Sequence, residues 1–178
     1  MKKNNPIDFN DYFRPPSCAG SWSPSWGDAE IPDTAVPKWD SRFIQLAKFV
    51  STWSKDPSTQ VGAVIVDKNN RIVSVGYNGF PSNIVDDDRL NDREFKIKHI
   101  THAEENALIS SGKTCLSGCA IYTYPFQPCQ HCAKMIRNFG ISKVVSLSSN
   151  IQRWEESFKN AREIFQEAGI KLHLFQTE

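Results

Sequence analysis

The sequence lacks both a long apolar run and an excess of charge of one sign, and each absence excludes a class of protein. Lys and Arg number 21 and Asp and Glu 20, which gives a formal net charge of +1. With both signs mixed along the chain, there is no electrostatic footprint for tight nucleic-acid binding. No apolar stretch approaches the roughly 20 residues of a membrane-spanning helix. The first residues, Met1 to Lys3, lead into Asn and Pro rather than into the apolar core of a signal peptide. We therefore expect a soluble cytoplasmic protein that binds neither nucleic acid nor membrane.

The cysteines are few and odd in number, which argues against a disulfide framework. The chain has five cysteines in 178 residues, and an odd count fits a reducing compartment better than an oxidising one. A chain of this length suits one domain with a substantial core.

Proline is concentrated at the N-terminus, which separates this segment from the rest of the chain. Six of the ten prolines fall within residues 1–37, and such a segment forms no long helix or strand. Aromatic residues such as Trp22 and Trp26 are unusual in a purely disordered tail. We expect an irregular arm over residues 1–37 that packs on the core or on a neighbouring subunit, with a floppy extension as the alternative. The folded domain is then expected over residues 38–178.

The remainder of the chain alternates between helical and strand-like patterns. Helices are predicted from Asp40 or Ser41 to about Ser54, and over residues 102–111, 129–140 and 152–168. Strands are predicted over residues 61–66, 71–77, 119–124, 143–147 and 170–175, the first two as a hairpin. This order predicts an α/β fold, with a mixed five-stranded sheet covered by helices on both faces. The polar segment 80–98 favours a solvated loop, whereas Asn78-Gly79 is expected to need unusual backbone angles.

Two short segments carry side chains that suit a metal site. They are His102-Ala103-Glu104 and Pro128-Cys129-Gln130-His131-Cys132. Cys129 and Cys132 are three residues apart at the start of a predicted helix, so their thiols share one face, and the exposed N–H groups there favour thiolates. With the His102 imidazole they can bind Zn²⁺ and leave a fourth position open, as in a catalytic zinc site. Glu104 can then take and pass on a proton.

Three other interpretations of the cysteine pair exist. A redox dithiol leaves His102-Ala103-Glu104 unexplained. A closed structural zinc site needs a fourth ligand, and none of the available candidates has an obvious spacing. A coincidence of residue types is the third alternative.

The chain from about Trp39 to Phe175 resembles the deoxycytidylate (dCMP) deaminases of the cytidine deaminase superfamily. The H-x-E and P-C-x-x-C pair is the signature of zinc deaminases. The resemblance also rests on the segments Lys55–Ala63, Gly76–Pro81, His102–Ala107, Phe126–Cys129 and Gly140–Val144. It implies a three-layer α/β/α cytidine-deaminase-like fold and the hydrolysis of dCMP to dUMP and ammonia.

The resemblance also implies roles for individual residues. Zinc is held by His102, Cys129 and Cys132, and activates a water for attack on C4 of cytosine while Glu104 moves protons to N3 and to the leaving ammonia. The backbone N–H of Ala103 steadies the pyrimidine carbonyl, and Asn78 holds the sugar 3′-hydroxyl. Phosphate contacts are expected from Ser54, Lys55 and Ser58, with Arg153 as a further candidate. The family often has a tyrosine after the fourth strand, where this chain reads Ser148 to Trp154.

A regulatory site follows from the same resemblance. The family's effector segment corresponds here to Tyr77, Gly79, Phe80, Asp86 and Asp87. These residues are expected to bind dCTP as activator and dTTP as inhibitor, with Mg²⁺ on the triphosphate. A homo-oligomer, a hexamer by resemblance, is expected to accompany this regulation.

Other functions remain alternatives. The same zinc site could serve another cytosine or adenine substrate, such as a free nucleoside or tRNA, but the last helix mixes Arg and Lys with Glu instead of forming a basic face. A zinc-stabilised binding module without activity is a non-enzymatic alternative, against which the intact Glu104 argues.

Overall fold

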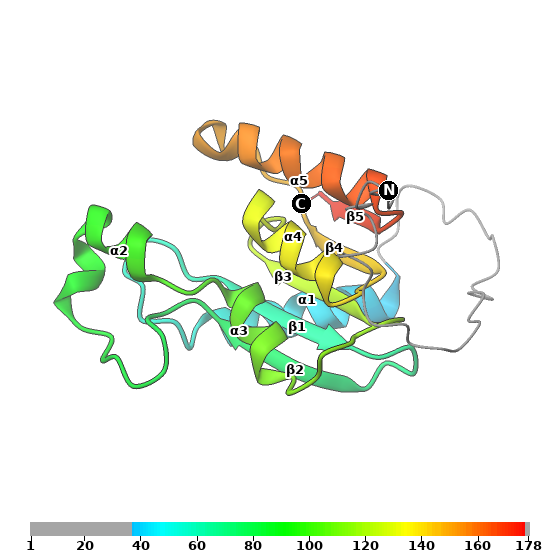
Figure 1. Cartoon of the computed structure of the whole chain (residues 1–178), viewed down its shortest axis with the longest axis horizontal. Coiled ribbons are helices and arrows are strands. Elements are labelled where there is room, and N and C mark those ends of the chain that lie inside the picture. The colour runs from blue at the N-terminus through cyan, green and yellow to red at the C-terminus, as the bar shows by residue number, and fades with distance from the viewer. Residues whose placement is uncertain (1–36, 177–178) are drawn as a thin grey trace, which may run out of the picture.

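The computed structural model describes residues 37–176, which form a five-stranded sheet packed between helices (Figure 1). The strands are β1 (Gly62–Val66), β2 (Ile72–Tyr77), β3 (Ala120–Tyr124), β4 (Lys143–Leu147) and β5 (Lys171–Phe175). Their order in the sheet is β2-β1-β3-β4-β5. Strand β1 pairs antiparallel with β2 and β3, whereas β3, β4 and β5 run parallel. The mixed sheet and the β1–β2 hairpin predicted from the sequence are confirmed.

Helices cover both faces of the sheet, so the three-layer α/β/α architecture is confirmed. Helix α1 (Lys38–Ser51) packs on one face, where Phe43, Ala47 and Val50 meet side chains of β1, β3 and β4. The opposite face carries α3 (Ala103–Ser110), α4 (Gln130–Asn138) and α5 (Glu155–Glu167). Strand β1 is buried along its whole length because helices lie on both sides of it.

Two glycines let the helices approach the sheet closely. A Cβ at Gly62 would clash with the backbone of Ala47 in α1, and a Cβ at Gly76 would clash with the backbone of Ala103 and Ala107 in α3. The two close approaches lie on opposite faces of neighbouring strands. Because the predicted zinc ligand His102 directly precedes α3, the glycine in β2 helps to set the position of the site.

The first helix begins two or three residues, and ends three residues, earlier in the chain than predicted. Helix α1 begins at Lys38, after Pro37, and ends at Ser51. Asp40 does not cap it. Its carboxylate is buried and accepts a hydrogen bond from the Tyr122 hydroxyl at 2.6 Å, and it forms an ion pair with Lys143 at 2.8 Å. Asp40 is therefore held by residues far away in the sequence, and such contacts cannot be predicted from the neighbouring residues.

The prediction of a loop over residues 80–98 holds for residues 80–87 but is wrong for the rest of the segment. The segment contains a short 3₁₀ helix at Asp88–Asn91 and helix α2 at Arg93–His99. The Asp87 carboxylate caps the first and the Asp92 carboxylate caps the second. No residue of α2 is fully buried, and Figure 1 shows it to one side of the layered body. A helix without a buried stripe gives no periodic signal in the sequence.

Three further sequence expectations concern composition. Among residues 37–176, every helix is too short or too polar to cross a lipid bilayer. The arm predicted over residues 1–37 lies outside the described residues, except for Pro37. Cys119, Cys129 and Cys132 are free thiols.

Candidate active site

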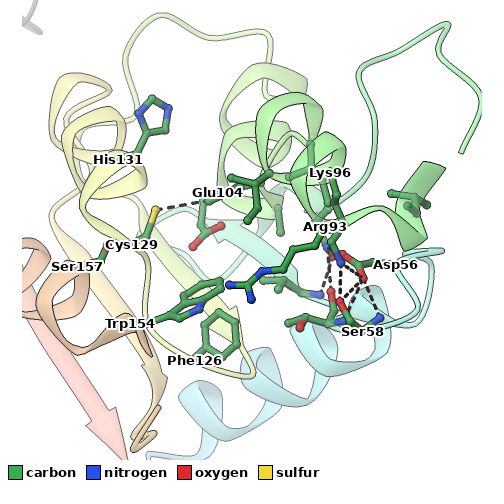
Figure 2. A pocket seen from close by; sticks show the side chains of 18 of the residues that line it. Asp56, Ser58, Arg93, Lys96, Glu104, Phe126, Cys129, His131, Trp154 and Ser157 are labelled. Atoms are coloured by element: carbon green, nitrogen blue, oxygen red, sulfur yellow. Dashed lines mark hydrogen bonds and ion pairs between the residues drawn. The ribbon is translucent and has the colours of Figure 1, made fainter. Parts of the chain in front are cut away.

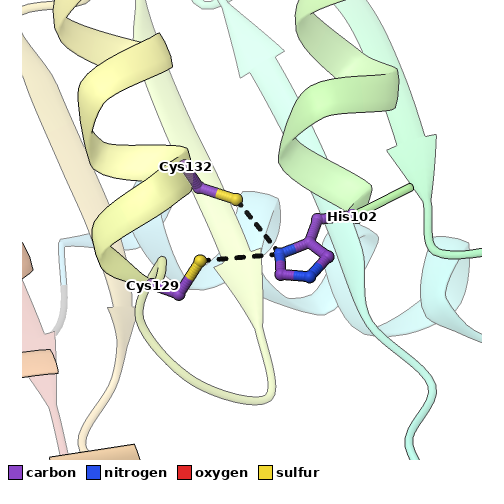
Figure 3. A group of neighbouring side chains, drawn as sticks. All are labelled: His102, Cys129 and Cys132. Carbon is purple, nitrogen blue, oxygen red and sulfur yellow. Dashed lines mark hydrogen bonds between the residues drawn. The ribbon is translucent and has the colours of Figure 1, made fainter. Parts of the chain in front are cut away.

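The starts of helices α3 and α4 bring the three predicted zinc ligands together (Figure 3). His102 is the N-cap residue of α3, Cys129 is the N-cap residue of α4, and Cys132 lies in the first turn of α4. The His102 Nδ1 atom is 3.3 Å from the Cys132 Sγ atom and 3.5 Å from the Cys129 Sγ atom. All three ligand atoms lie within 4.8 Å of one another. The sequence prediction of one cluster between two helix N-termini is confirmed.

The chemistry of this donor set fits zinc. Two thiols and one imidazole are the soft and borderline donors that Zn²⁺ prefers. A hydrogen bond from Cys132, with another from His102, lowers the pKa of Cys129 to about 3. The same cluster raises the pKa of His102 to about 9, chiefly through its hydrogen bond to Cys129. Hydrogen bonding to Cys129 and burial raise the pKa of Cys132. A metal that binds here must therefore displace protons from His102 and Cys132.

Residues 37–176 supply three ligands to the cluster, one fewer than a tetrahedral zinc site needs. Within the described part of the chain, no other His, Cys, Asp or Glu joins these three residues as a ligand group. His131 points elsewhere, to the Glu105 carboxylate at 3.2 Å. Three protein ligands with an open position are typical of a catalytic zinc site and not of a structural one.

Glu105 connects the two helix starts that hold the ligands. One of its carboxylate oxygens accepts a hydrogen bond from the backbone N–H of His102 at 3.1 Å, and the other lies 3.2 Å from His131 Nε2 on α4. This carboxylate therefore caps α3 and reaches across to α4. The spacing between the ligand-bearing helices depends in part on this bridge.

Glu104 lies beside the cluster without belonging to it. Its side chain is 4% exposed and lines the cavity together with Cys129 (Figure 2). Burial raises the pKa of this carboxyl group, although the nearby His102 charge opposes the shift. A carboxylate whose pKa is raised is a stronger base than an exposed one, and is therefore better able to accept a proton and pass it on during a reaction.

The cavity in front of Glu104 has a volume of about 670 Å³. It opens where β2 and β3 end and where β1 begins, the edge at which α/β sheets bind ligands. Its walls come from the segment before β1, from α2, from the starts of α3 and α4, and from the segment that leads into α5. This volume is of the size that small-molecule sites have.

Asn78 lies on the cavity wall with its amide fixed by the backbone. Its Oδ1 accepts a hydrogen bond from Val61 N at 2.8 Å, and its Nδ2 donates to Thr59 O at 2.9 Å and to Asp56 Oδ2 at 3.3 Å. Both amide hydrogens are used, so only Oδ1 retains a lone pair for a ligand. Asn78 can therefore accept a hydrogen bond from a hydroxyl group in the cavity.

The residues predicted to contact phosphate are divided by the structure. Ser58 and Arg153 line the cavity, whereas Ser54 and Lys55 do not. Ser54 is buried, and its hydroxyl donates to the Asn78 carbonyl oxygen at 2.7 Å. It thus supports the loop that carries Asn78.

None of the predicted effector residues lines the cavity. Neither Asn78 nor Gly79 has a positive φ, so the expectation of unusual angles there is wrong. The backbone N–H of Gly79 donates to Thr101 O at 3.2 Å, and that of Phe80 donates to Asp86 Oδ1 at 2.9 Å. Asp87 pairs with Arg89 at 2.8 Å. These N–H and carboxylate groups already serve the local fold.

Several cavity residues were not singled out by the sequence. Arg93 and Lys96 come from α2, which the sequence did not predict. Phe126 and Trp154 form an aromatic wall, with ring centroids 5.0 Å apart, and Trp154 lies in the region where the family often has a tyrosine. The aromatic side chain of Trp154 in this region was the one feature of the sequence that could have indicated a residue of the cavity wall.

Known proteins are similar to this chain in sequence. The family model described as "Cytidine and deoxycytidylate deaminase zinc-binding region" matches residues 37–148. The chain is 45% identical over 140 residues to a protein of Aliivibrio fischeri named "Uncharacterized deaminase in luxG 3'region", covering 77% of this chain and 93% of that protein. It is 36% identical over 144 residues to the human deoxycytidylate deaminase, covering 78% of this chain and 80% of that one.

A solved structure agrees with this relationship. The dCMP deaminase of the cyanophage S-TIM5, in complex with dCMP and dUMP, is 26% identical and superposes with a TM-score of 0.64. The match covers 80% of this chain and 99% of the phage chain. By the family match, the relatives and the geometry of His102, Cys129 and Cys132, the chain belongs to the cytidine and deoxycytidylate deaminase family of zinc-binding enzymes.

Proposed function

We propose that this protein catalyses the hydrolytic deamination of dCMP to dUMP and ammonia. The observation that carries the proposal is the three-ligand His-Cys-Cys cluster beside the buried carboxyl group of Glu104, at the base of a cavity of nucleotide size. Relatives named deoxycytidylate deaminase, and the phage enzyme that binds dCMP and dUMP, support the choice of substrate.

The zinc ligands and Glu104 divide the chemistry between them. Zinc held by His102, Cys129 and Cys132 supplies a Lewis acid that makes water a nucleophile at neutral pH. Glu104 accepts a proton from the attacking water and delivers it to N3 of the pyrimidine. It then takes the proton of the new C4 hydroxyl group and delivers it to the amino group, which leaves as ammonia as the C4 carbonyl forms. Because water adds and ammonia leaves, the carboxyl group returns to its starting state after each turnover.

Other residues orient the nucleotide. The backbone N–H of Ala103 lies in the first turn of α3, where N–H groups have no acceptor within the helix, and can donate to the pyrimidine carbonyl. The free lone pair of Asn78 Oδ1 accepts from the sugar 3′-hydroxyl. The aromatic wall of Phe126 and Trp154 packs against the apolar parts of the ligand.

A steady-state comparison of four substrates tests the proposal. Zinc-loaded protein is assayed with dCMP, deoxycytidine, dCTP and a short RNA, and dCMP is expected to have the highest kcat/KM. Equal kcat/KM for deoxycytidine and dCMP would refute a preference for the monophosphate. Turnover of the RNA alone would instead assign the site to a nucleic acid.

Regulation by nucleotides is a second part of the proposal. We infer from the family resemblance that dCTP activates and dTTP inhibits, with Mg²⁺ on the triphosphate and with Tyr77, Gly79, Phe80, Asp86 and Asp87 as contacts. Since the Gly79 and Phe80 N–H groups are already hydrogen-bonded, the resemblance alone supports this inference. Saturation curves for dCMP, with Mg²⁺ and each triphosphate, test it. Unchanged hyperbolic curves and no triphosphate binding by calorimetry would refute it.

Assembly into a homo-oligomer, a hexamer by resemblance, completes the proposal. Helix α1 and its C-terminal turn expose Trp39, Phe49 and Trp53, each between 46% and 59%, and exposed aromatic side chains are typical of interfaces. Light scattering of the full chain gives the mass directly, and a monomer would exclude this part. The cytoplasmic location stays a prediction from the sequence.

A further inference from the structure

Helix α2 presents two cations to the active-site cavity. Arg93 and Lys96 both line it, together with Asn91, Ile97 and Ile100 from the same segment. Residues three apart lie on one side of a helix, so the two positive side chains share the side of α2 that faces the cavity. Glu104 and the zinc ligands come from other elements, α3 and α4.

The Lys96 side chain is already bound to residues in the wall of the cavity. Its ammonium nitrogen lies 2.9 Å from Asp56 Oδ1 and also donates to the Ser58 hydroxyl. Its side chain is only 13% exposed, and that of Asp56 only 3%. The positive charge of Lys96 is therefore balanced by a buried carboxylate, and its main effect is to attach α2 to the segment before β1.

Arg93 has no comparable ion pair among residues 37–176. It is exposed, and no carboxylate of residues 37–176 lies within ion-pair distance of its guanidinium group. Figure 2 shows its side chain extending from α2 into the cavity. An uncompensated guanidinium group with its N–H donors facing a cavity is suited to bind a phosphate in two-point geometry.

The order of groups along the wall indicates which part of a nucleotide Arg93 would meet. The base belongs beside Glu104, and the sugar hydroxyl beside Asn78. The Asn78 amide is 3.3 Å from Asp56, which in turn holds Lys96 of α2. Moving along the wall from the base to the sugar thus leads to α2, where the 5′-phosphate would follow.

We propose that Arg93 binds the 5′-phosphate of the substrate and so selects a nucleoside monophosphate over the free nucleoside. This inference rests on the proposed function, and it adds a specificity-determining residue from the helix that covers the cavity. Lys96 is then a positioning residue, because it holds α2 and Arg93 in place. Arg153 lies on another wall, with its guanidinium carbon 5.7 Å from the ring centroid of Trp154.

The test compares Arg93→Gln with Lys98→Gln in full-length, zinc-loaded protein. Lys98 is on the same helix and exposed, but it does not line the cavity, so the control changes the same charge without touching the site. For Arg93→Gln, kcat/KM for dCMP is expected to fall by about 10- to 100-fold, the loss typical of a hydrogen bond to a charged group. The loss should fall mainly on KM. The value for deoxycytidine should stay unchanged, and Lys98→Gln should change neither substrate.

Each other outcome has a distinct meaning. Wild-type protein without a preference for dCMP would refute the proposed substrate before any variant is compared. If the wild type prefers dCMP and Arg93→Gln retains that preference, only the assignment of Arg93 is overturned. An equal loss on both substrates would indicate a structural role and also overturn it. A selective loss in Arg153→Gln, absent in Arg93→Gln, would place the phosphate on the opposite wall.

Discussion

The ammonium nitrogen of Lys96 lies 2.9 Å from the buried carboxylate of Asp56, and this contact ties a peripheral helix to the wall of the active site. Asp56 also accepts hydrogen bonds from the backbone N–H groups of Ser58 and Thr59, and it receives one from the Asn78 amide. One carboxylate therefore orients both the residue proposed for the sugar and the helix proposed for the phosphate.

Replacing Asp56 by Asn should loosen α2 and raise KM for dCMP more than it lowers kcat. The Asn side chain keeps some hydrogen bonds but leaves the Lys96 charge uncompensated in a largely buried position. Kinetics with dCMP provide the measurement, and Glu94→Gln, an exposed change on α2, is the control. Equal KM values for Asp56→Asn and wild type would show that the contact does not position the helix.

The same variant should change how stability depends on pH. Burial would raise the pKa of Asp56, but the hydrogen bonds from Lys96, Ser58 and Thr59 outweigh it and hold the pKa below its usual value. Because the folded-state pKa is lowered, the contribution is fully present above the unfolded-state value of about 4 and is lost as the pH falls through the folded-state value. The difference in urea-unfolding free energy between wild type and Asp56→Asn should therefore shrink below about pH 4. A difference that stays constant from neutral to acid pH would contradict this.

Cys129→Ser and Cys132→Ser should each lose zinc and activity together. A serine hydroxyl does not replace a thiolate ligand, and the remaining two donors hold the metal too weakly. Elemental analysis of the purified protein measures the metal, and Cys119→Ser, at a free cysteine outside the cluster, should keep it. Active wild-type protein with less than about half an equivalent of zinc or a similar metal would contradict the assignment.

Glu104→Gln should keep the fold and the zinc but lose about 10³-fold or more in turnover. The amide has nearly the same shape as the carboxyl group but cannot carry the proton. Circular dichroism and zinc content establish that the variant is intact, and single-turnover kinetics measure the loss. Retained activity would assign the proton transfer to another residue, while loss of zinc would make Glu104 a ligand.

Gly62→Ala and Gly76→Ala should both destabilise the protein, by about 1–3 kcal/mol or more, because the added Cβ meets helix backbone that must shift. Gly118→Ala is the comparison: its φ of +76° strains alanine, but a Cβ there meets nothing within 4 Å. Thermal unfolding ranks the three variants. If the first two lost no more stability than Gly118→Ala, close helix–sheet packing would not be what these positions require.

The sequence by itself determined the elements whose signals are local. A continuous apolar run such as residues 62–66 predicts a strand covered on both faces, and the structure shows this strand buried along its whole length. The His102, Cys129 and Cys132 ligands follow from short spacings at two helix starts, where neighbouring residues fix the geometry. The zinc chemistry and the five strands of the mixed sheet were available from these signals, whereas the order of the strands came from the structure.

Tertiary structure alone decided the wall of the cavity. Helix α2 has no buried residue, so its polar sequence shows no periodicity. Its role depends on Lys96 meeting Asp56, 40 positions away in the chain. Ser54, expected to contact phosphate, turns instead toward the Asn78 carbonyl, and Asp40 turns toward Tyr122. A buried polar group must find its hydrogen-bond partner wherever the fold places one, and a sequence does not reveal which distant partner that is.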